Sequence, residues 1–191
     1  VRRGVAVAHP AFGHSVHVDV TGLSPDGEYW YAFRCGNELS PVGRTRTLPA
    51  ENDPVSRFRF NVVSCQNWEQ GYFDAYNGMA ADDPSFVMHL GDYIYDVSRG
   101  GGVRSHERRE LPMTLDDYRR RHALYKSDAA LRRAHETLPF ILTLDNHDAL
   151  EDDSGDVSQL KRRAAAYQAW YEFQPVRYAP SPASPANRTS S

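Results

Sequence analysis

The stretch FVMHLGDYIYD, Phe86 to Asp96, decides the fold that we expect for this chain. It opens with an apolar run that is typical of a buried strand in a covered sheet. Gly91 then permits a sharp turn, because glycine tolerates backbone angles that other residues avoid. Asp92 follows just past the carboxyl end of the strand, where open α/β sheets place their ligands. Tyr93, Tyr95 and Asp96 follow within four residues and add further oxygen donors. A carboxylate and a phenol on one such turn can face one hard metal ion, although a strand end with surface tyrosines explains this stretch alone equally well.

Two further strand-like runs end in residues that can hold a metal. The first is RFRFNVVSC, which ends in Cys65, and the second is FILTLDNH, which ends in Asp145, Asn146 and His147. Parallel strands joined by helices bring their carboxyl ends to one edge of the sheet. Thiol, carboxylate, phenol, amide and imidazole groups would therefore converge there. Three such strand ends in order favour a metal site over coincidence.

At this point the sequence resembles the PhoD-type alkaline phosphatases and phosphodiesterases, within the calcineurin-like metallophosphoesterases. The resemblance covers nearly the whole chain. It is carried by YWYAFRCGNELSPVGRTRTLP at 29–49, SCQNWEQGYFDAY at 64–76, HLGDYIYD at 89–96, LDDYRRRHALYKSD at 115–128 and LPFILTLDNHD at 138–148. It implies an α/β metallophosphoesterase, an αββα sandwich that is incomplete at its carboxyl end, preceded by part of a small β-sandwich of the Fn3 or Ig type.

The resemblance also implies the chemistry of the site. Fe3+ would be held by Cys65, Asp92 and Tyr95, since anionic thiolate, carboxylate and phenolate donors favour a highly charged iron. Asp92 would bridge to a second metal, Ca2+ in similar enzymes, to which Asn146 offers an oxygen. A hydroxide shared by the two metals would attack the phosphorus of a phosphate mono- or diester in line with the leaving alcohol. His147 is the candidate to stabilise charge or to protonate the leaving group.

The third strand end departs from the family pattern. The family word is Trp-Asp-Asp-His-Glu, whereas residues 144–148 read LDNHD. Asn146 replaces a carboxylate, so the second metal site loses one negative charge. The wider superfamily uses Asn-His at this place, so a ligand role for Asn146 is kept while the choice of the second metal stays open. We expect Asp145 and Asp148 to be capping or supporting residues rather than ligands.

Composition describes an ordinary globular chain of 191 residues with 40% hydrophobic residues and a net charge of -3. That charge gives no electrostatic reason to expect a nucleic acid as an obligate partner. No run of ~18 apolar residues that could span a membrane is present. Cys35 and Cys65 do not make a disulfide framework. The chain begins without Met and without a signal peptide, so we expect a start that has been cut, and a full-length protein that is monomeric and secreted, periplasmic or on the cell surface.

We expect two domains. Residues 1–50 would be a partial amino-terminal β-sandwich, with strands at 14–20, around 28–35 and at 43–48, in which His9, His14 and His17 are surface or packing residues. Residues 51–56 read as a linker, and residues 57–191 as the amino-terminal half of the catalytic domain.

Within the second domain we expect helices on the sheet and one open segment between them. A helix at 71–82 would pack through Tyr72, Ala75, Tyr76 and Met79. Residues 96–112 read as a mobile, glycine-rich loop that either is simply solvated or attracts an anionic substrate through Arg99, Arg104, Arg108 and Arg109.

Capping patterns place the later helices. Thr114 opens one helix in a weak capping box with Asp117, and Ser127 would cap the next. In the first of these, Leu115, Tyr118 and Tyr125 would face inward while Arg119, Arg120 and Arg121 face solvent, and His106, His122 and His135 would be structural. A last helix at 157–173 shows Leu160, Ala164, Tyr167 and Tyr171 at helical spacing, between an acidic, flexible run and a proline-rich tail that reads as loop or disorder.

Three functions fit these patterns. The first is a metal-dependent phosphoesterase, the second a binding module built on an inactive phosphoesterase half, and the third a hydrolase with Cys65 as nucleophile. No basic partner lies near Cys65 in the sequence, which disfavours the third. We further expect residues 1–191 alone to hydrolyse little, because no later strand supplies the additional Asp and His ligands that such a site needs.

Overall fold

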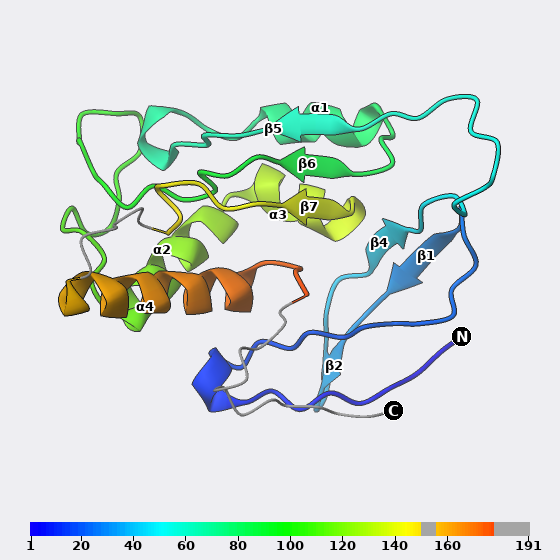
Figure 1. The fold of residues 1–191 in the computed structure, drawn as a ribbon, viewed down its shortest axis with the longest axis horizontal. Helices are drawn as coiled ribbons and strands as arrows, with labels where there is room; N and C mark the ends of the chain where they lie inside the picture. Colours follow the sequence, from blue (N-terminus) through cyan, green and yellow to red (C-terminus); the bar gives the residue numbers. More distant parts are fainter. Residues whose placement is uncertain (150–155, 178–191) are drawn as a thin grey trace.

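The computed structural model describes residues 1–149 and 156–177 and contains the expected parallel sheet. Its strands lie in the order β5 (Asn61–Val63), β6 (Val87–His89) and β7 (Phe140–Leu142). β6 pairs in parallel with both neighbours, and Val63 and Leu142 both lie opposite His89. The three carboxyl ends therefore point to the same edge, where the loops after the strands gather (Figure 1).

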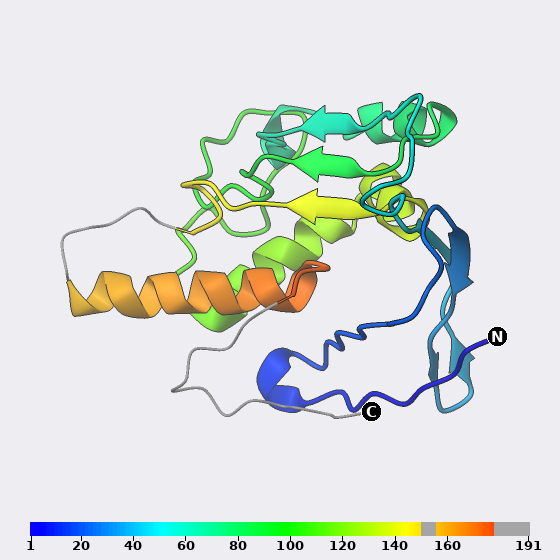
Figure 2. The same cartoon turned by 45° about the vertical axis from the view of Figure 1, so that its right-hand side comes forward.

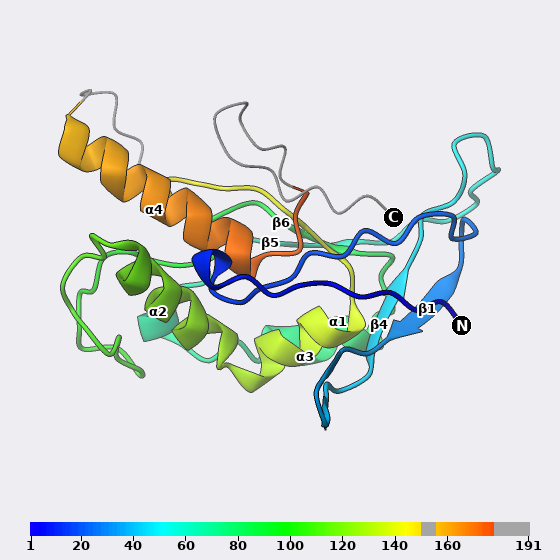
Figure 3. The ribbon, with the colours of Figure 1, turned by 90° about the horizontal axis from the view of Figure 1, so that it is seen from below.

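Helices cover one face of this sheet. Val87 is fully buried and Phe140 nearly so, in a core with α1 (Ala75–Ala81), α2 (Leu115–Lys126) and α3 (Ala129–Thr137). Figure 3 shows these three helices together on one side of the strands. Residues on the opposite face of a strand alternate with the buried ones. On that face Val62 and Ile141 are 52% and 47% exposed, so the described residues leave it open.

The starts of the first two long helices differ in how well the sequence predicts them. The Thr114–Asp117 capping box is present at the start of α2, as expected. The cap of α3 is Asp128 rather than Ser127, because the Asp128 carboxylate accepts the N–H groups of Ala130 and Leu131. Ser127 ends α2 instead, which corrects the predicted boundary by one residue.

Two predicted helix faces were wrong. Tyr72 was expected to face the core, but α1 begins after it and its side chain is 66% exposed. Arg121 was expected to face solvent, yet only 6% of it is exposed. Tyr118 and Tyr125 of the same helix are fully buried, as predicted, and so is His122.

The helix α4 (Val157–Phe173) has the predicted bounds but buries another face. Leu160 and Tyr167 are exposed, whereas the buried residues are Arg162, Ala166, Ala169 and Glu172. α4 packs on α2 and runs along the β7 edge of the sheet (Figure 2). Small residues at the contact allow this close packing, and the two buried charges each have a partner: Asp96 for Arg162 and Arg119 for Glu172.

Residues 1–50 contain two short antiparallel ladders. β1 (Glu28–Tyr31) pairs with β4 (Gly43–Arg46), and β2 (Arg34–Cys35) pairs with β3 (Glu38–Leu39). The predicted strand at 14–20 is wrong, because within the described residues no part of this segment pairs with another strand and the segment begins in the turn after a short 3-10 helix, Pro10–Phe12. The β-sandwich and the domain boundaries stay predictions. Arg44 and Arg46 pair with Glu28 inside the β1–β4 ladder, and both also pair with Asp83, which precedes β6 and so links the ladder to the parallel sheet.

Three remaining expectations concern the acidic and proline-rich segments, the two cysteines and membrane-spanning helices. Most of the acidic run after Asp148, and most of the proline-rich tail, lie outside the described residues. Cys35 and Cys65 are both free thiols. Among the helices of the described residues, none is both long enough and apolar enough to cross a membrane.

Candidate metal centre

The first two strand ends adopt backbone conformations that are rare outside glycine. Cys65 and Asp92 both have positive φ, 55° and 53°, and Gly91 has φ 104°. The two turns pair with each other, because the N–H of Cys65 donates to the Gly91 carbonyl and the N–H of Gln66 to the Asp92 carbonyl, both at 3.2 Å. Non-glycine residues held in the left-handed region cluster at functional sites. Here the strain falls on two of the predicted ligands.

Asp92 lies at the centre of the donor group, by which we mean Cys65, Asp92 and Tyr95. Its Oδ2 accepts the Tyr95 hydroxyl at 3.3 Å, and its Oδ1 accepts the backbone N–H of His147 at 3.2 Å. Only 6% of Asp92 is exposed. The carboxylate thus joins the ends of β6 and β7, and the β5 end reaches the same turn through its backbone bonds to the Gly91 and Asp92 carbonyls.

Tyr95 faces both Asp92 and Cys65. The pKa of its phenol is raised, mainly by burial and further by the nearby Asp92 and Cys65 groups, which disfavour a phenolate. A bound cation reverses this effect, because it stabilises the phenolate, thiolate and carboxylate together.

These three donors fit the iron implied by the sequence. Counting only Cys, His, Asp and Glu, the described residues contain no group of three that could hold a metal. The fit therefore depends on the phenol of Tyr95 as the third donor, and a thiol–carboxylate–phenol set is suited to a hard, highly charged ion that tolerates sulfur.

The third strand end contributes less directly. Asn146 is exposed, and its backbone N–H donates to Asp145 Oδ1 at 2.8 Å. Asp148 is fully buried and accepts the N–H groups of Ile94 and Asp145, at 3.0 and 3.1 Å. Burial raises its pKa to about 6. Asp148 therefore ties the two loops together, in agreement with its expected capping role.

His147 has a buried partner that the sequence did not single out. Its Nδ1 lies 2.8 Å from Asp96 Oδ1, and its ring lies on the Tyr95 ring with centroids 4.3 Å apart. The second oxygen of Asp96 accepts a bond from Arg162 of α4 at 2.9 Å. Asp96 was recognised only as an oxygen donor at the end of the turn. The signal for Arg162 is a charged residue four and seven positions before the buried Ala166 and Ala169.

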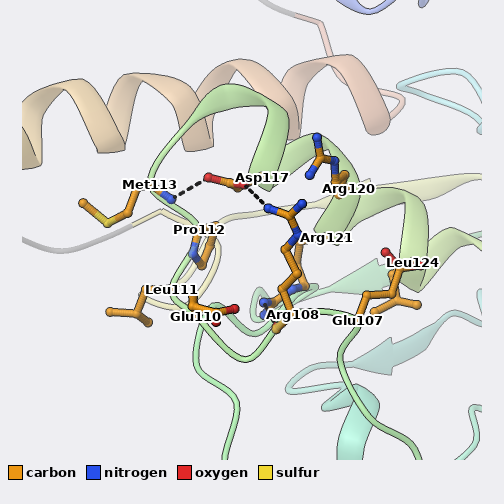
Figure 4. A pocket seen from close by; sticks show the side chains of 10 residues that line it. All are labelled: Glu107, Arg108, Glu110, Leu111, Pro112, Met113, Asp117, Arg120, Arg121 and Leu124. Atoms are coloured by element: carbon orange, nitrogen blue, oxygen red, sulfur yellow. Dashed lines mark hydrogen bonds and ion pairs between the residues drawn. The ribbon is translucent and has the colours of Figure 1, made fainter.

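Arg121 of α2 holds the turn of Tyr95 and Asp96 through hydrogen bonds to its backbone. Its guanidinium donates to the carbonyls of Tyr95, Asp96 and Arg108. A pocket of about 280 Å3 lies beside it, between residues 107–113 and α2. Figure 4 shows the Asp117 carboxylate between two partners in this pocket. It accepts the Met113 N–H at 3.3 Å and pairs with the Arg108 guanidinium at 3.9 Å. The pocket is lined by side chains of both charge signs and by none of Cys65, Asp92 and Tyr95.

Tyr125 connects two of the loops through its hydroxyl. That oxygen accepts the N–H of Tyr95 at 3.0 Å and the N–H of Trp68 at 3.2 Å. The side chain is fully buried, which raises its pKa to about 12. The tyrosine was predicted only as a core residue.

Residues 97–106 have defined anchors, contrary to the expected mobile loop. The buried Glu69 carboxylate accepts the Ser98 hydroxyl and the N–H groups of Arg99 and Gly100. Arg104 pairs with Asp128 at 2.7 Å and stacks on Trp68 at 3.6 Å, so it is occupied structurally. Arg99, Arg108 and Arg109 are exposed and remain candidates to attract an anion.

Comparison with known proteins gives this arrangement a family. The family model "PhoD-like phosphatase" matches residues 60–190, and the model of its N-terminal domain matches residues 1–49. The chain belongs to the PhoD-like phosphatase family. It is 44% identical to alkaline phosphatase D of Bacillus subtilis (strain 168), with 97% of this chain and 34% of that protein covered. The chain thus spans about a third of the length of this curated relative.

Solved structures agree with the fold. A structure of PhoD superposes with a TM-score of 0.85 at 46% identity, over 93% of this chain and 36% of that one. A purple acid phosphatase from yellow lupin (Lupinus luteus) seeds superposes with a TM-score of 0.52 at 16% identity, over 84% of this chain and 27% of that one. The second likeness concerns the fold alone. Together they identify the α/β architecture as that of a metallophosphoesterase.

Proposed function

We propose that the protein hydrolyses phosphate mono- or diesters at the strand ends around Asp92. The observation that carries the proposal is the pair of contacts at that carboxylate, one to the Tyr95 hydroxyl and one to the His147 backbone. They join the turn after β6 to the loop after β7, and the N–H of Cys65, after β5, donates to the neighbouring Gly91 carbonyl. Membership of the PhoD-like phosphatase family supports the same reaction class.

In this proposal Cys65, Asp92 and Tyr95 hold Fe3+, and Asp92 together with Asn146 contributes to a second site that takes Ca2+. Two metal ions would supply positive charge for the phosphate oxygens and an ionised water as the nucleophile. The protein's own part is to keep the three donors in place. The paired turns at Cys65 and Gly91 and the buried Asp92 carboxylate do this.

His147 acts on the leaving group. Asp96 accepts a hydrogen bond from Nδ1–H, so Nε2 is the ring nitrogen free to act on the substrate. In the imidazolium form, with a proton on each nitrogen, Nε2 gives its proton to the departing alkoxide and His147 becomes neutral. An alkoxide is a poor leaving group, so its protonation lowers the barrier for an alkyl ester. For p-nitrophenolate, a weak base, the same proton matters less.

The whole reaction requires more than the described part of this chain. Within it, donors for the second metal are limited to Asp92 and the exposed Asn146, and one face of the sheet is open. We propose that further ligands and a second sheet come from elsewhere in the complete protein, which would be secreted, periplasmic or on the cell surface. A purely binding role is the alternative, favoured by the absence of a three-residue Cys, His, Asp or Glu group among the described residues.

Hydrolysis by a longer form of the protein and by residues 1–191 tests this function. Both are assayed with Fe and Ca2+ on p-nitrophenyl phosphate and bis(p-nitrophenyl) phosphate. We expect turnover by the longer form and little by residues 1–191. Failure of the longer form with both esters would favour the binding role, and equal turnover by the two forms would refute the need for further ligands.

His147→Ala in the longer form tests the assigned acid. Turnover of a phenyl or alkyl ester should fall by about 10²–10⁴-fold while iron stays bound, because His147 is placed beside the leaving group. His14→Asn is the control, since His14 is exposed and distant in sequence from the strand ends. Loss of iron from His147→Ala would instead make this histidine a ligand.

A further inference from the structure

The His147–Asp96 pair is connected to α4 by a buried arginine. Arg162 donates from NH2 to Asp96 Oδ2 at 2.9 Å and from Nε to the Pro112 carbonyl at 2.8 Å. Arg162 and Asp96 are each 5% exposed. Asp96 uses its other oxygen for His147 Nδ1 at 2.8 Å. One carboxylate thus joins a guanidinium on α4 to the imidazole at the end of β7.

The two oxygens of Asp96 have separate tasks. A carboxylate that bonded only His147 could rotate about its Cβ–Cγ bond and carry the imidazole with it. Arg162 removes this freedom, because its planar guanidinium is itself fixed at a second point by the Pro112 carbonyl. The backbone of the same turn is held independently, since Arg121 of α2 donates to the carbonyls of Tyr95 and Asp96.

We propose that Arg162 is a positioning residue for His147, acting through Asp96. This rests on the proposed function of His147 as the acid for the leaving group. Within the described part of the chain, Arg162 bonds the Pro112 carbonyl and Asp96 rather than Cys65, Asp92 or Tyr95. Its effect is to keep Asp96 Oδ1 on Nδ1, so that Nε2 stays the nitrogen that donates to the leaving group. Partners that orient a functional histidine affect activity by about 10-fold to 100-fold when they are removed.

This assignment differs from a purely structural role in what it predicts for different leaving groups. Loss of a structural contact would lower the rate for every ester alike. Loss of a positioning contact should lower the rate mainly where the leaving group needs a proton. It should also have little effect once His147 has been removed, because residues that act as a unit give non-additive losses.

The test uses the longer, metal-loaded form of the protein with Arg162→Gln, His147→Ala and the double variant. Rates are measured for p-nitrophenyl phosphate and phenyl phosphate. Arg163→Gln is the control on the neighbouring position of α4, where the side chain contacts the Tyr167 hydroxyl instead. We expect Arg162→Gln to lower kcat for the phenyl ester by about 10-fold to 100-fold, to lower it less for the nitrophenyl ester, and to change little in the His147→Ala background. Arg162→Lys should restore part of the loss.

A measurement without turnover completes the test. In metal-free protein labelled with 15N at histidine, the His147 ring should carry its proton on Nδ1, and Arg162→Gln should give a mixture of tautomers. Equal losses for both esters, losses that add to those of His147→Ala, or an unchanged tautomer would each overturn the proposal. If His147→Ala itself leaves both rates unchanged, the proposed acid is wrong and the role of Arg162 is wrong with it.

Discussion

Gly91 shows how closely the strand ends approach one another. A side chain at this position would bring its Cβ within 2.5 Å of Asp145 Cβ and 2.7 Å of the Asp145 backbone nitrogen, and φ is 104°. Only glycine fits both restrictions. The turn that presents Asp92 therefore depends on the absence of a side chain one residue earlier.

Gly91→Ala should destabilise the protein by about 2–4 kcal/mol, from the clash with backbone atoms and the strained φ. Chemical denaturation of the variant and the parent measures this. Gly78→Ala is the matched control, because Gly78 lies in α1 with open space around it. The stability of this variant should equal or slightly exceed that of the parent. A Gly91→Ala variant as stable as the parent would show that the two loops are not packed as described.

Residue types predicted that the strand ends meet, because parallel strands bring the ends of such apolar runs to one edge. The roles of Cys65, Asp92, Tyr95 and His147 were implied by the family resemblance and stay predictions. The pairing of Asp96 with Arg162 was not recognised, because it joins parts of the chain 66 residues apart and follows no local pattern. Asn146 was named as a ligand on the family pattern, and that assignment stays a prediction.

At the scale of the elements, the start of α3 also anchors the neighbouring loop. The Asp128 carboxylate caps α3 through Oδ1 and pairs with Arg104 through Oδ2. Arg104 in turn donates to the carbonyls of Trp68 and Gly71. One acidic side chain thus joins α3 to the loops that follow β5 and β6.

Asp128→Ala should cost more than a helix cap alone. Losing the cap costs about 1 kcal/mol, and leaving Arg104 without its buried partner adds about 3 kcal/mol or more. Ser127→Ala, at the residue first predicted as the cap, should change stability by less than about 1 kcal/mol. Thermal or urea unfolding measures the loss of stability in each variant. Equal losses would contradict the assignment of the cap to Asp128 rather than Ser127.

Helix bounds were easier to predict than helix faces. The range of α4 followed from residues at helical spacing, whereas its buried face does not follow from hydrophobicity. Leu160 and Tyr167 form the more apolar stripe, yet α4 buries Arg162 and Glu172 because each meets an opposite charge on another element. The strand predicted from the alternating valines at 14–20 was wrong for a similar reason, since a strand needs a pairing partner that local sequence does not reveal.

At the scale of the whole molecule, a group of basic side chains lies between the sheet and its helices. Lys126 of α2 contacts His135 of α3 at 3.1 Å, and His135 contacts the Tyr93 hydroxyl at 2.9 Å. His89 of β6 and His122 of α2 flank the Tyr93 ring. No carboxylate pairs with Lys126 in the described part of the chain, and burial lowers its pKa to about 7. Burial also lowers the pKa of His89 to about 4 and that of His122 to about 3.

This group should make the fold more stable at alkaline pH. The ordinary lysine pKa is 10.5, so between about pH 7 and 10.5 the unfolded chain binds a proton at Lys126 that the folded chain does not. Stability then rises with pH by up to about 1.4 kcal/mol per unit in that window. Below about pH 6.5 the lowered pKa values of the histidines also make stability rise with pH. The raised pKa of Asp148 has the opposite effect there, because the folded chain keeps a proton on Asp148 that the unfolded chain loses.

Urea unfolding at pH 7, 8 and 9 measures the effect in the window where Lys126 dominates. We expect the free energy of unfolding to rise by about 2 kcal/mol over this range in the parent protein. Lys126→Met should flatten the rise, while Lys161→Met, at an exposed position of α4, should leave it unchanged. A rise that persists in Lys126→Met would assign the pH dependence to other groups.

The central claim is that three strand ends form an iron site around Asp92, and the iron content and visible spectrum of the longer form test it most directly. Parent protein, Cys65→Ser, Tyr95→Phe and the control Tyr72→Phe are compared, Tyr72 being an exposed tyrosine away from the donors. We predict one iron per chain and a phenolate-to-iron absorption in the parent and in Tyr72→Phe. Tyr95→Phe should lose that absorption, and Cys65→Ser should hold less iron. Unchanged iron and unchanged absorption in both site variants would contradict it.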